Sequence, residues 1–308
     1  MDPLSNLPGK PVGNRRKFII NSAKTAGVLL AMPVMSKAGN FISINENYTV
    51  GQIMDLFINS VPGGAITKTV DTLKSGSRDT VVTGIVMTMF ATIEVIRKTI
   101  ELGANFIIAH EPTFYNHADD TTWLKNDEVY KYKADLLKQH NIAVWRNHDY
   151  IHTLVPDGVM TGVLKQMDWE KYADKAIPNI ITLPPTSLKN LISYTKSKLH
   201  IDKVRYIGDP EQVCKRVLFM EGSPGGHAEI EDVTTTKPDV LICGEISEWE
   251  IAEYVRDARA KGDSLALVVT GHIASEEPGS EFMLGWLMQH VPSVKVTHIL
   301  SGNSLSFL

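Results

Sequence analysis

The stretch Phe106-Ile107-Ile108-Ala109-His110-Glu111-Pro112 decides the fold together with a second stretch, Leu265-Ala266-Leu267-Val268-Val269-Thr270-Gly271-His272-Ile273-Ala274-Ser275-Glu276. In each, a short apolar run typical of a buried strand leads directly into histidine and carboxylate side chains. Each also follows a helical pattern that stops at a glycine, Gly103 in the first case and Gly262 in the second. Because ligands gather at the carboxyl ends of strands in open α/β sheets, the two stretches predict one metal site built by both halves of the fold.

The rest of the chain alternates strand patterns with helix patterns. Apolar, β-branched runs predict strands at residues 81–89, 106–109, 142–145, 204–208, 217–220, 240–245 and 265–270. Apolar residues at helical spacing predict helices over residues 50–58, 93–100, 130–139, 188–199 and 247–260. Residues 183–187, which contain two prolines, are expected to form a loop. This alternation indicates parallel βαβ units and therefore an α/β fold.

The composition limits the class of protein. The 308 residues are 43% hydrophobic, which is enough for one large domain or for two compact lobes. The formal net charge of −4 is mild, and we find no basic run with interleaved aromatic residues, so we expect no nucleic-acid partner. Cys214 and Cys243 are expected to be buried free thiols, with a disulfide in an oxidising compartment as the alternative.

Residues 1–38 have the order of a twin-arginine export signal. Asn14-Arg15-Arg16-Lys17-Phe18-Ile19-Ile20 places paired arginines before apolar residues, residues 26–35 form a modest apolar stretch, and Ser36-Lys37-Ala38 offers a cleavage site. The apolar stretch is shorter than the roughly 20 residues that a membrane-spanning helix needs. We therefore expect an exported, periplasmic protein without a stable membrane span, and a linker over residues 39–49. The alternative is a basic tail without a signal function.

His272 and Glu276 form the first candidate pair of metal ligands. They are four residues apart, so both face one side of a helix that begins after the strand. An imidazole and a carboxylate placed in this way suit a divalent transition metal. The alternative is a surface histidine near a solvated carboxylate. We favour the metal, because solvated groups need no buried strand beneath them.

His110 and Glu111 form the second candidate pair. Adjacent side chains diverge in regular structure, so both can reach one site only where the chain turns. Pro112 favours an extended conformation for Glu111 and so moves the chain away from helix at this point. The alternative interpretation makes His110 a core histidine that closes the end of the strand.

A third cluster, Arg146-Asn147-His148-Asp149-Tyr150-Ile151-His152, follows the strand predicted at residues 142–145. His117 and His227 lie in polar loops and are expected to be incidental surface groups. Two other chemistries lack their motifs, because we find neither a phosphate-binding loop with its lysine nor a Gly-x-Ser-x-Gly nucleophile elbow. The glycine-rich segment at residues 222–226 could still cradle an anion with its backbone N–H groups.

Several motifs, in order along residues 50–308, carry a family resemblance. The first family motif is Gly-Ala-Asp, followed by a strand and His-His-Pro. Its counterpart here is Gly103-Ala104-Asn105, followed by a predicted strand and His110-Glu111-Pro112. The segment His148-Asp149-Tyr150-Ile151-His152, with Gly158-Val159 after it, resembles His-Thr-Asn-Leu-Asp with its Gly-Val. The later family motifs are a glycine-rich turn, Asp-Leu-Ile-Thr-Gly-Glu and Gly-His-Tyr-x-x-Glu. Their counterparts here are residues 222–226, Asp239-Val240-Leu241-Ile242-Cys243-Gly244-Glu245 and Gly271-His272-Ile273-Ala274-Ser275-Glu276. These residues are similar to the Nif3-like family of dinuclear-metal proteins, often labelled type 2 GTP cyclohydrolase homologues.

The resemblance implies a set of metal ligands with two departures from the family pattern. Glu111 stands where the family has its second histidine, and His152 stands where the family has an aspartate. The implied ligands are again three histidines and two carboxylates: His110, Glu111, His152, His272 and Glu276. The two exchanges preserve the charge of the site. Asp149 remains an alternative to His152 as a ligand.

The resemblance also implies two similar αβ lobes that meet at the metal site, one over about residues 50–165 and one over about residues 166–308. Family members form ring-like hexamers, so we expect a homo-oligomer. We expect two divalent ions (Zn, Mn or Fe) and metal-dependent hydrolysis of a small substrate, with phosphate- or nucleotide-containing molecules as candidates. His148 is the expected proton-transfer group, and Glu245 is expected to orient a ligand.

Two other functions remain open at this point. One is metal binding or metal handling without turnover, which would use the same ligands. The other is a member that keeps the fold and has lost its metals through the changes at Glu111 and His152. Nothing in the sequence resembles a site that reads guanine, so the family label gives no expectation of GTP chemistry.

Overall fold

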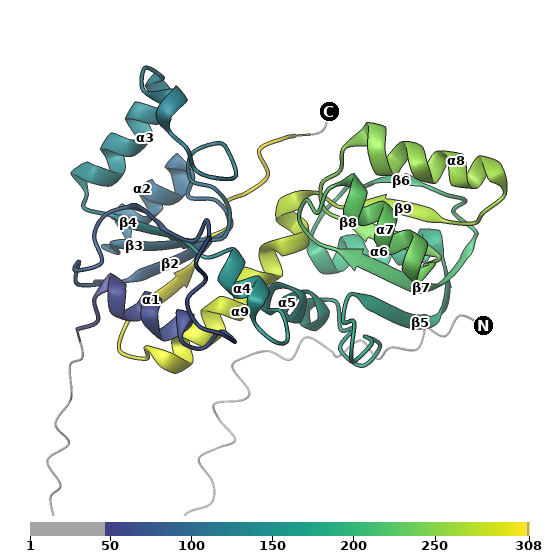
Figure 1. Cartoon of the computed structure of the whole chain (residues 1–308), viewed down its shortest axis with the longest axis horizontal. Coiled ribbons are helices and arrows are strands. Elements are labelled where there is room, and N and C mark those ends of the chain that lie inside the picture. Colours follow the sequence, from purple (N-terminus) through teal and green to yellow (C-terminus); the bar gives the residue numbers. More distant parts are fainter. Residues whose placement is uncertain (1–46, 307) are drawn as a thin grey trace, which may run out of the picture. The chain divides into compact units, whose positions relative to one another are not determined.

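The computed structural model describes residues 47–306 and 308. The predicted export signal and residues 39–46 of the predicted linker lie outside this range. The described part contains two five-stranded sheets (Figure 1). Each sheet is covered by helices on both faces, which is the layered arrangement of α/β proteins.

The first sheet has the strand order β1-β4-β3-β2-β10. Its strands are β1 (Leu73–Ser75), β4 (Ala143–Arg146), β3 (Phe106–Ala109), β2 (Ile85–Thr88) and β10 (Val296–His298). Strand β1 runs antiparallel to β4, and the other neighbours are parallel. The strands β2, β3 and β4 are buried along their whole length, as expected for parallel strands covered on both faces.

Alternate residues of these strands enter two different cores. Ile85 and Met87 pack with α1 (Val50–Ile58) and the C-terminal half of α9 (His272–His290). Val86, between them, faces the other core, with α2 (Ile93–Glu101) and α3 (Glu128–Gln139). A 3-10 turn at Thr122–Leu124 lies between β3 and α3, and the short helix α4 (Asp149–Thr153) follows the end of β4.

The second sheet has the strand order β5-β7-β8-β9-β6. Its strands are β5 (Ile180–Ser187), β7 (Val213–Met220), β8 (Val240–Cys243), β9 (Ala266–Val269) and β6 (Arg205–Ile207). The two outer pairings are antiparallel and the two inner ones are parallel. One face packs on α5 (Gly158–Gln166) and α6 (Leu188–Leu199), and the other packs on α7 (Gly226–Thr236), α8 (Glu253–Lys261) and a π-helical turn at Glu248–Ala252.

These observations confirm the predicted α/β fold with two similar lobes. The lobes do not follow the predicted division at residue 166, because β10 pairs with β2 in the first sheet. Helix α9 brings the chain back, since Met283 and Leu287 are buried in the core of the first lobe. The reason is visible in Figure 1, where α9 runs from the second sheet to the first.

Glycines let α5 and α9 approach each other closely. A Cβ at Gly162 would lie 2.1 Å from the carbonyl oxygen of Pro278, and a Cβ at Gly279 would lie 2.9 Å from a methyl group of Val159. Any larger residue at these positions would force the helices apart. The contact fixes the N-terminal half of α9, which carries His272 and Glu276.

One local prediction is wrong. Residues 183–187 were expected to form a loop because of Pro184 and Pro185, but they belong to β5. Strand β5 lies at the edge of its sheet, and its pairing with β7 shifts between Thr182 and Thr186. Proline is tolerated at such an edge, because no ladder hydrogen bond is needed from its nitrogen.

The structure also bears on two expectations from composition. Cys214 and Cys243 are buried free thiols, as predicted. Among the helices of residues 47–306, none combines the length and the apolar character needed to cross a bilayer.

Candidate metal centre

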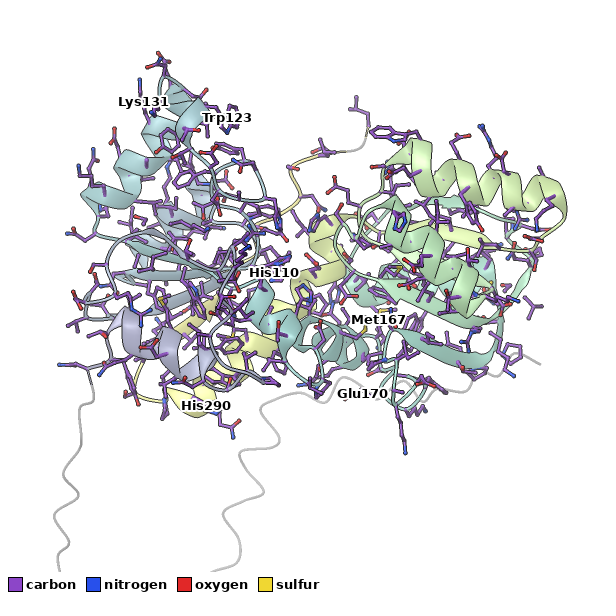
Figure 2. The ribbon with its side chains drawn as sticks, viewed as in Figure 1. His110, Trp123, Lys131, Met167, Glu170 and His290 are labelled. Atoms are coloured by element: carbon purple, nitrogen blue, oxygen red, sulfur yellow. The ribbon has the colours of Figure 1, made fainter. Side chains whose placement is uncertain are left out.

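The candidate centre is built where β3 and β4 of the first sheet and β9 of the second sheet end. His110 and Glu111 follow β3 directly, and His148 follows β4 at the start of α4, which carries His152. In the second lobe, β9 leads through Thr270 and Gly271 into α9, whose first residue is His272. Figure 2 marks His110, whose ring centroid lies 5.2 Å from that of His152.

Glu276 and Glu111 are the two carboxylates on which the imidazoles converge. The Nε2 atom of His272 lies 3.0 Å from Oε2 of Glu276 and 3.3 Å from Oε1 of Glu111. The Nε2 atom of His110 lies 3.5 Å from Oε2 of Glu276 and 3.8 Å from Oε1 of Glu111. The two predicted pairs, from different lobes, therefore meet at one point.

His148 and His152 face the same carboxylates from a greater distance. The Nε2 atom of His148 lies 4.0 Å from Oε1 of Glu111, and the Nε2 atom of His152 lies 4.0 Å from Oε1 of Glu276. Their ring centroids are 5.0 Å apart. All four imidazoles thus turn the same nitrogen toward the centre.

The other ring nitrogen of each histidine is held by an acceptor on the outside. The Nδ1–H groups donate from His110 to the carbonyl of Asn147 at 3.2 Å, from His148 to Asp149 at 2.9 Å, from His152 to Asp157 at 2.8 Å, and from His272 to Glu245 at 2.9 Å. An imidazole that donates through Nδ1 offers an unprotonated Nε2 in its neutral form. Metal-binding histidines are usually oriented by such outer acceptors.

The charges in the centre favour a bound cation. Burial alone would raise the pKa of Glu111, but the hydrogen bond from His272 and the charge at His110 lower it below its ordinary value. Burial also opposes ionisation of Glu276, yet His110 and His272 hold its pKa well below the ordinary range. Both carboxylates are therefore ionised, and their negative charges would attract a divalent ion.

The two remaining histidines differ in charge. Burial, followed by the charge at His110, lowers the pKa of His148 to about 4, so this ring is neutral near neutral pH. Burial acts in the same direction on His152, but Asp157 and Glu276 raise its pKa to about 9. Asp149 lies behind His148 and also accepts hydrogen bonds from Thr69 at 2.7 Å and the backbone of Val70 at 3.1 Å.

Two buried atoms of the centre have no hydrogen-bond partner among the described residues. They are Nε2 of His110 and Oε2 of Glu276, and each belongs to a side chain that is almost fully buried. Ligand atoms of His110, Glu111 and Glu276 all lie within 4.8 Å of one another, and so do those of His110, His148 and His152. Mixed imidazole and carboxylate donors of this kind suit Zn, Mn or Fe. The residues present therefore fit a divalent metal.

Arg146 contacts both His110 and Glu111, and this supporting role was not predicted from the sequence. Its side chain is fully buried, and its Nε donates to the carbonyl of His110 at 3.2 Å. Its Nη2 lies 3.6 Å from Oε2 of Glu111. Asp71 is a second unpredicted support, since it accepts from the backbone N–H groups of His148 at 2.9 Å and Tyr150 at 2.8 Å. Arg146 opens the third cluster described from the sequence, but no role was predicted for it there, and Asp71 lies outside every motif found in the sequence.

A cavity of about 320 Å³ opens beside the centre. Its lining includes His148, His152, Asn179, Glu221, Ser223 and Glu276. Burial, followed by the charge at Asp157, raises the pKa of the Glu221 carboxyl to about 8. A larger cavity of about 930 Å³ lies along α5 and α9, and its lining contains none of the predicted site residues. The smaller cavity is therefore the one that gives access to the centre.

In the glycine-rich segment at residues 222–226, two backbone N–H groups donate to side chains of the chain itself. The N–H of Gly222 donates to Ser275 at 2.9 Å, and the N–H of Gly226 donates to Glu250 at 3.1 Å. These two amides therefore have side-chain acceptors from the chain itself. His117 is exposed, with its ring centroid 5.8 Å from that of His148, and His227 is exposed on α7.

Comparison with known proteins places the chain among relatives. A family model described as Duf34/NIF3 (NGG1p interacting factor 3) matches residues 67–304. A protein of Clostridium acetobutylicum named GTP cyclohydrolase 1 type 2 homolog is 24% identical over 217 residues, which cover 67% of this chain and 76% of that protein.

Solved structures show the same architecture. The Staphylococcus aureus hypothetical protein SA1388 matches with a TM-score of 0.69 at 20% identity, covering 85% of this chain and 100% of that chain. A Bacillus cereus protein related to NIF3 matches with a TM-score of 0.66 at 16% identity, covering 84% and 98%. At these identities the structures support the fold.

Proposed function

The chain belongs to the Duf34/NIF3 family, and from this membership together with the geometry of the centre we propose that it is a metal-dependent hydrolase of a small substrate. The observation that carries the proposal is the convergence of four Nε2 atoms on Glu111 and Glu276. Two ions (Zn, Mn or Fe) would be held by His110, Glu111, His152, His272 and Glu276.

When bound, a divalent ion polarises a water molecule and so supplies a nucleophile near neutral pH. Glu245 keeps Nδ1 of His272 protonated and so aims Nε2 of the same ring at the carboxylates. His148 lines the cavity with Nδ1 bonded to Asp149, so its Nε2 would be positioned to accept a proton from a water molecule in the cavity. The cavity of about 320 Å³ is large enough for a small substrate.

Phosphate- and nucleotide-containing molecules are the substrate classes to be tested first. The support for them is the cluster of ligands that suits metal-assisted hydrolysis, together with the cavity beside it.

Metal handling without turnover is the second candidate function. It is favoured by the same ligands, because their spacing does not distinguish storage of a metal from catalysis. The access cavity is the observation that favours turnover over handling.

Elemental analysis of the purified protein is the deciding experiment. We expect stoichiometric metal in the wild type and its loss in His110→Ala and His272→Ala, with His227→Ala, an exposed histidine, as the control that keeps it. A wild-type protein without stoichiometric metal would overturn the proposed centre. If metal binds but phosphoesters and nucleotides stay intact, metal handling replaces hydrolysis as the function.

We also propose export to the periplasm, on the basis of the twin-arginine pattern in residues 1–38. Cell fractionation should find the mature protein outside the cytoplasm and an Arg15→Lys/Arg16→Lys variant inside it. Uncleaved wild-type protein that stays in the cytoplasm would contradict export. The proposed assembly is a homo-oligomer, with a hexamer as the expected size, and light scattering of the purified protein would measure it.

A further inference from the structure

Next to the proposed centre lies a second group of candidate ligands that includes two carboxylates with no role so far. His152, Asp157 and Glu221 each offer a ligand atom, and these atoms lie within 4.8 Å of one another. Glu221 comes directly after β7, and Asp157 precedes the first turn of α5. The group therefore joins the two lobes, as the centre does.

The group brings several carboxyl groups together around one imidazole. Glu276 adds a third carboxylate, with Oε1 4.0 Å from Nε2 of His152. In residues 47–306, no lysine or arginine forms an ion pair with Asp157 or Glu221. One imidazole thus faces three carboxylates, and Glu221 is partly buried at the wall of the cavity. Like charges brought together in this way require a cation or a proton between them.

We propose that His152, Asp157 and Glu221 bind a divalent cation at a site of their own beside the dinuclear centre. One imidazole and two carboxylates are suitable ligands for Zn²⁺, and three protein ligands leave one position open. Because Glu221 lines the cavity, the open position is available to a substrate or a water molecule. This inference rests on the proposed centre for its neighbour Glu276, and it adds a separate ion.

His152 can be a ligand of the outer site or of the dinuclear centre, but not of both at once. Its Nδ1 now donates to Asp157 at 2.8 Å, so a cation bound there must displace that proton. That proton is released to solvent, and a neutral imidazole that binds through Nδ1 carries its remaining proton on Nε2, which faces Glu276. The ring then no longer offers a lone pair to the centre, so His152 serves one site or the other. With the outer site filled, the ligands that remain for the centre are His110, Glu111, His272 and Glu276.

The test is the Zn²⁺ stoichiometry of the full chain after dialysis against Zn²⁺, measured by elemental analysis. We expect Glu221→Gln to bind one ion fewer than the wild type. Glu229→Gln is the matched control, because Glu229 is a buried glutamate of the same lobe that lies outside all of the ligand groups described here. It should bind as many ions as the wild type.

Asp157→Asn is the second variant. It keeps the proposal testable if Glu221→Gln fails to fold. Asp157 caps α5 by accepting from the backbone N–H of Met160 at 2.9 Å, and asparagine can keep that bond. It too should lose one ion. Equal stoichiometry in the wild type and both variants would overturn the outer site.

The outcomes also separate this inference from the proposed centre. A wild type with two ions that Glu221→Gln retains leaves the centre intact and removes the outer site. A wild type with a single ion, lost in Glu221→Gln and kept in His272→Ala, supports the outer site and contradicts the dinuclear centre.

Discussion

Glu276 lies directly against Gly222: a Cβ at residue 222 would be 2.1 Å from Oε1 of Glu276. The backbone of Gly222 also has a φ of +65°, in the left-handed region. The carboxylate that both lobes share is therefore held in place by the absence of a side chain on the facing loop.

Gly222→Ala should consequently displace Glu276 and weaken metal binding by roughly 10–100-fold, the range seen when ligand orientation is lost. Gly225→Ala is the matched control, because Gly225 has a φ of +87° and a Cβ added there would meet no atom within 4 Å. Both variants bear a backbone cost of about 1 kcal/mol. Zn²⁺ titration should separate them, and equal affinities would contradict the steric role of Gly222.

Glu245→Gln should weaken metal binding through His272. The glutamate is mostly exposed and holds Nδ1 of His272 at 2.9 Å, so its replacement frees the ring to rotate or change tautomer. The expected loss of affinity is roughly 10-fold or more. Glu248→Gln is the control, since Glu248 is an exposed neighbour that pairs with Arg205. Unchanged affinity in Glu245→Gln would show that packing alone orients His272.

Arg146→Met should destabilise the protein strongly. It leaves Glu111 without the guanidinium 3.6 Å away and breaks the bond to the carbonyl of His110. Removing one partner of a buried pair costs about 3–5 kcal/mol, and the melting temperature should fall by roughly 6–12 °C. Arg256→Met breaks an exposed pair with Glu253 and should cost less than about 1 kcal/mol. Similar melting temperatures for the two variants would argue against a supporting role for Arg146.

Glu229 should make the stability of the fold fall as the pH rises. Burial, followed by the charge of Glu250, raises the pKa of Glu229 from 4.5 to about 7. The folded state therefore binds more protons than the unfolded state between these values, and its stability is lost as the pH rises through about 7. The steepest loss is about 1.4 kcal/mol per pH unit.

Glu229→Gln should remove this dependence and be more stable than the wild type above pH 7. Urea unfolding at pH 5, 6, 7 and 8 would measure the difference between the two proteins. Glu231→Gln, on the exposed side of the same helix, should leave the slope unchanged. A wild-type slope that persists in Glu229→Gln would assign it to another group.

The parts of the centre that the sequence predicted are those fixed by local geometry. His272 and Glu276 are one helical turn apart, and Gly271 starts their helix. His110 and Glu111 follow a four-residue buried strand, whose predicted bounds, 106–109, agree with β3. Spacing along the chain is enough to recognise such residues.

The parts that the sequence did not predict depend on contacts between distant segments. Glu221 approaches His152 from the other lobe, and Arg146 is buried under Glu111 although its neighbours in sequence indicate only a strand end. The boundary between the lobes was predicted wrongly for the same reason. Strand β10 has only three residues, and it pairs with β2, which is distant from it along the chain. Weak local signals of this kind are settled by tertiary packing.

The return of the chain through α9 makes the second lobe, in topological terms, an insertion into the first. A single cut between the lobes would leave the first sheet without β10 and its core without Met283 and Leu287. Two cuts are needed to excise the second lobe, and the excised piece would lack His110 and Glu111. Neither lobe can therefore form the centre by itself. Gene fragments that end before α9 would encode neither a complete core nor a complete set of ligands.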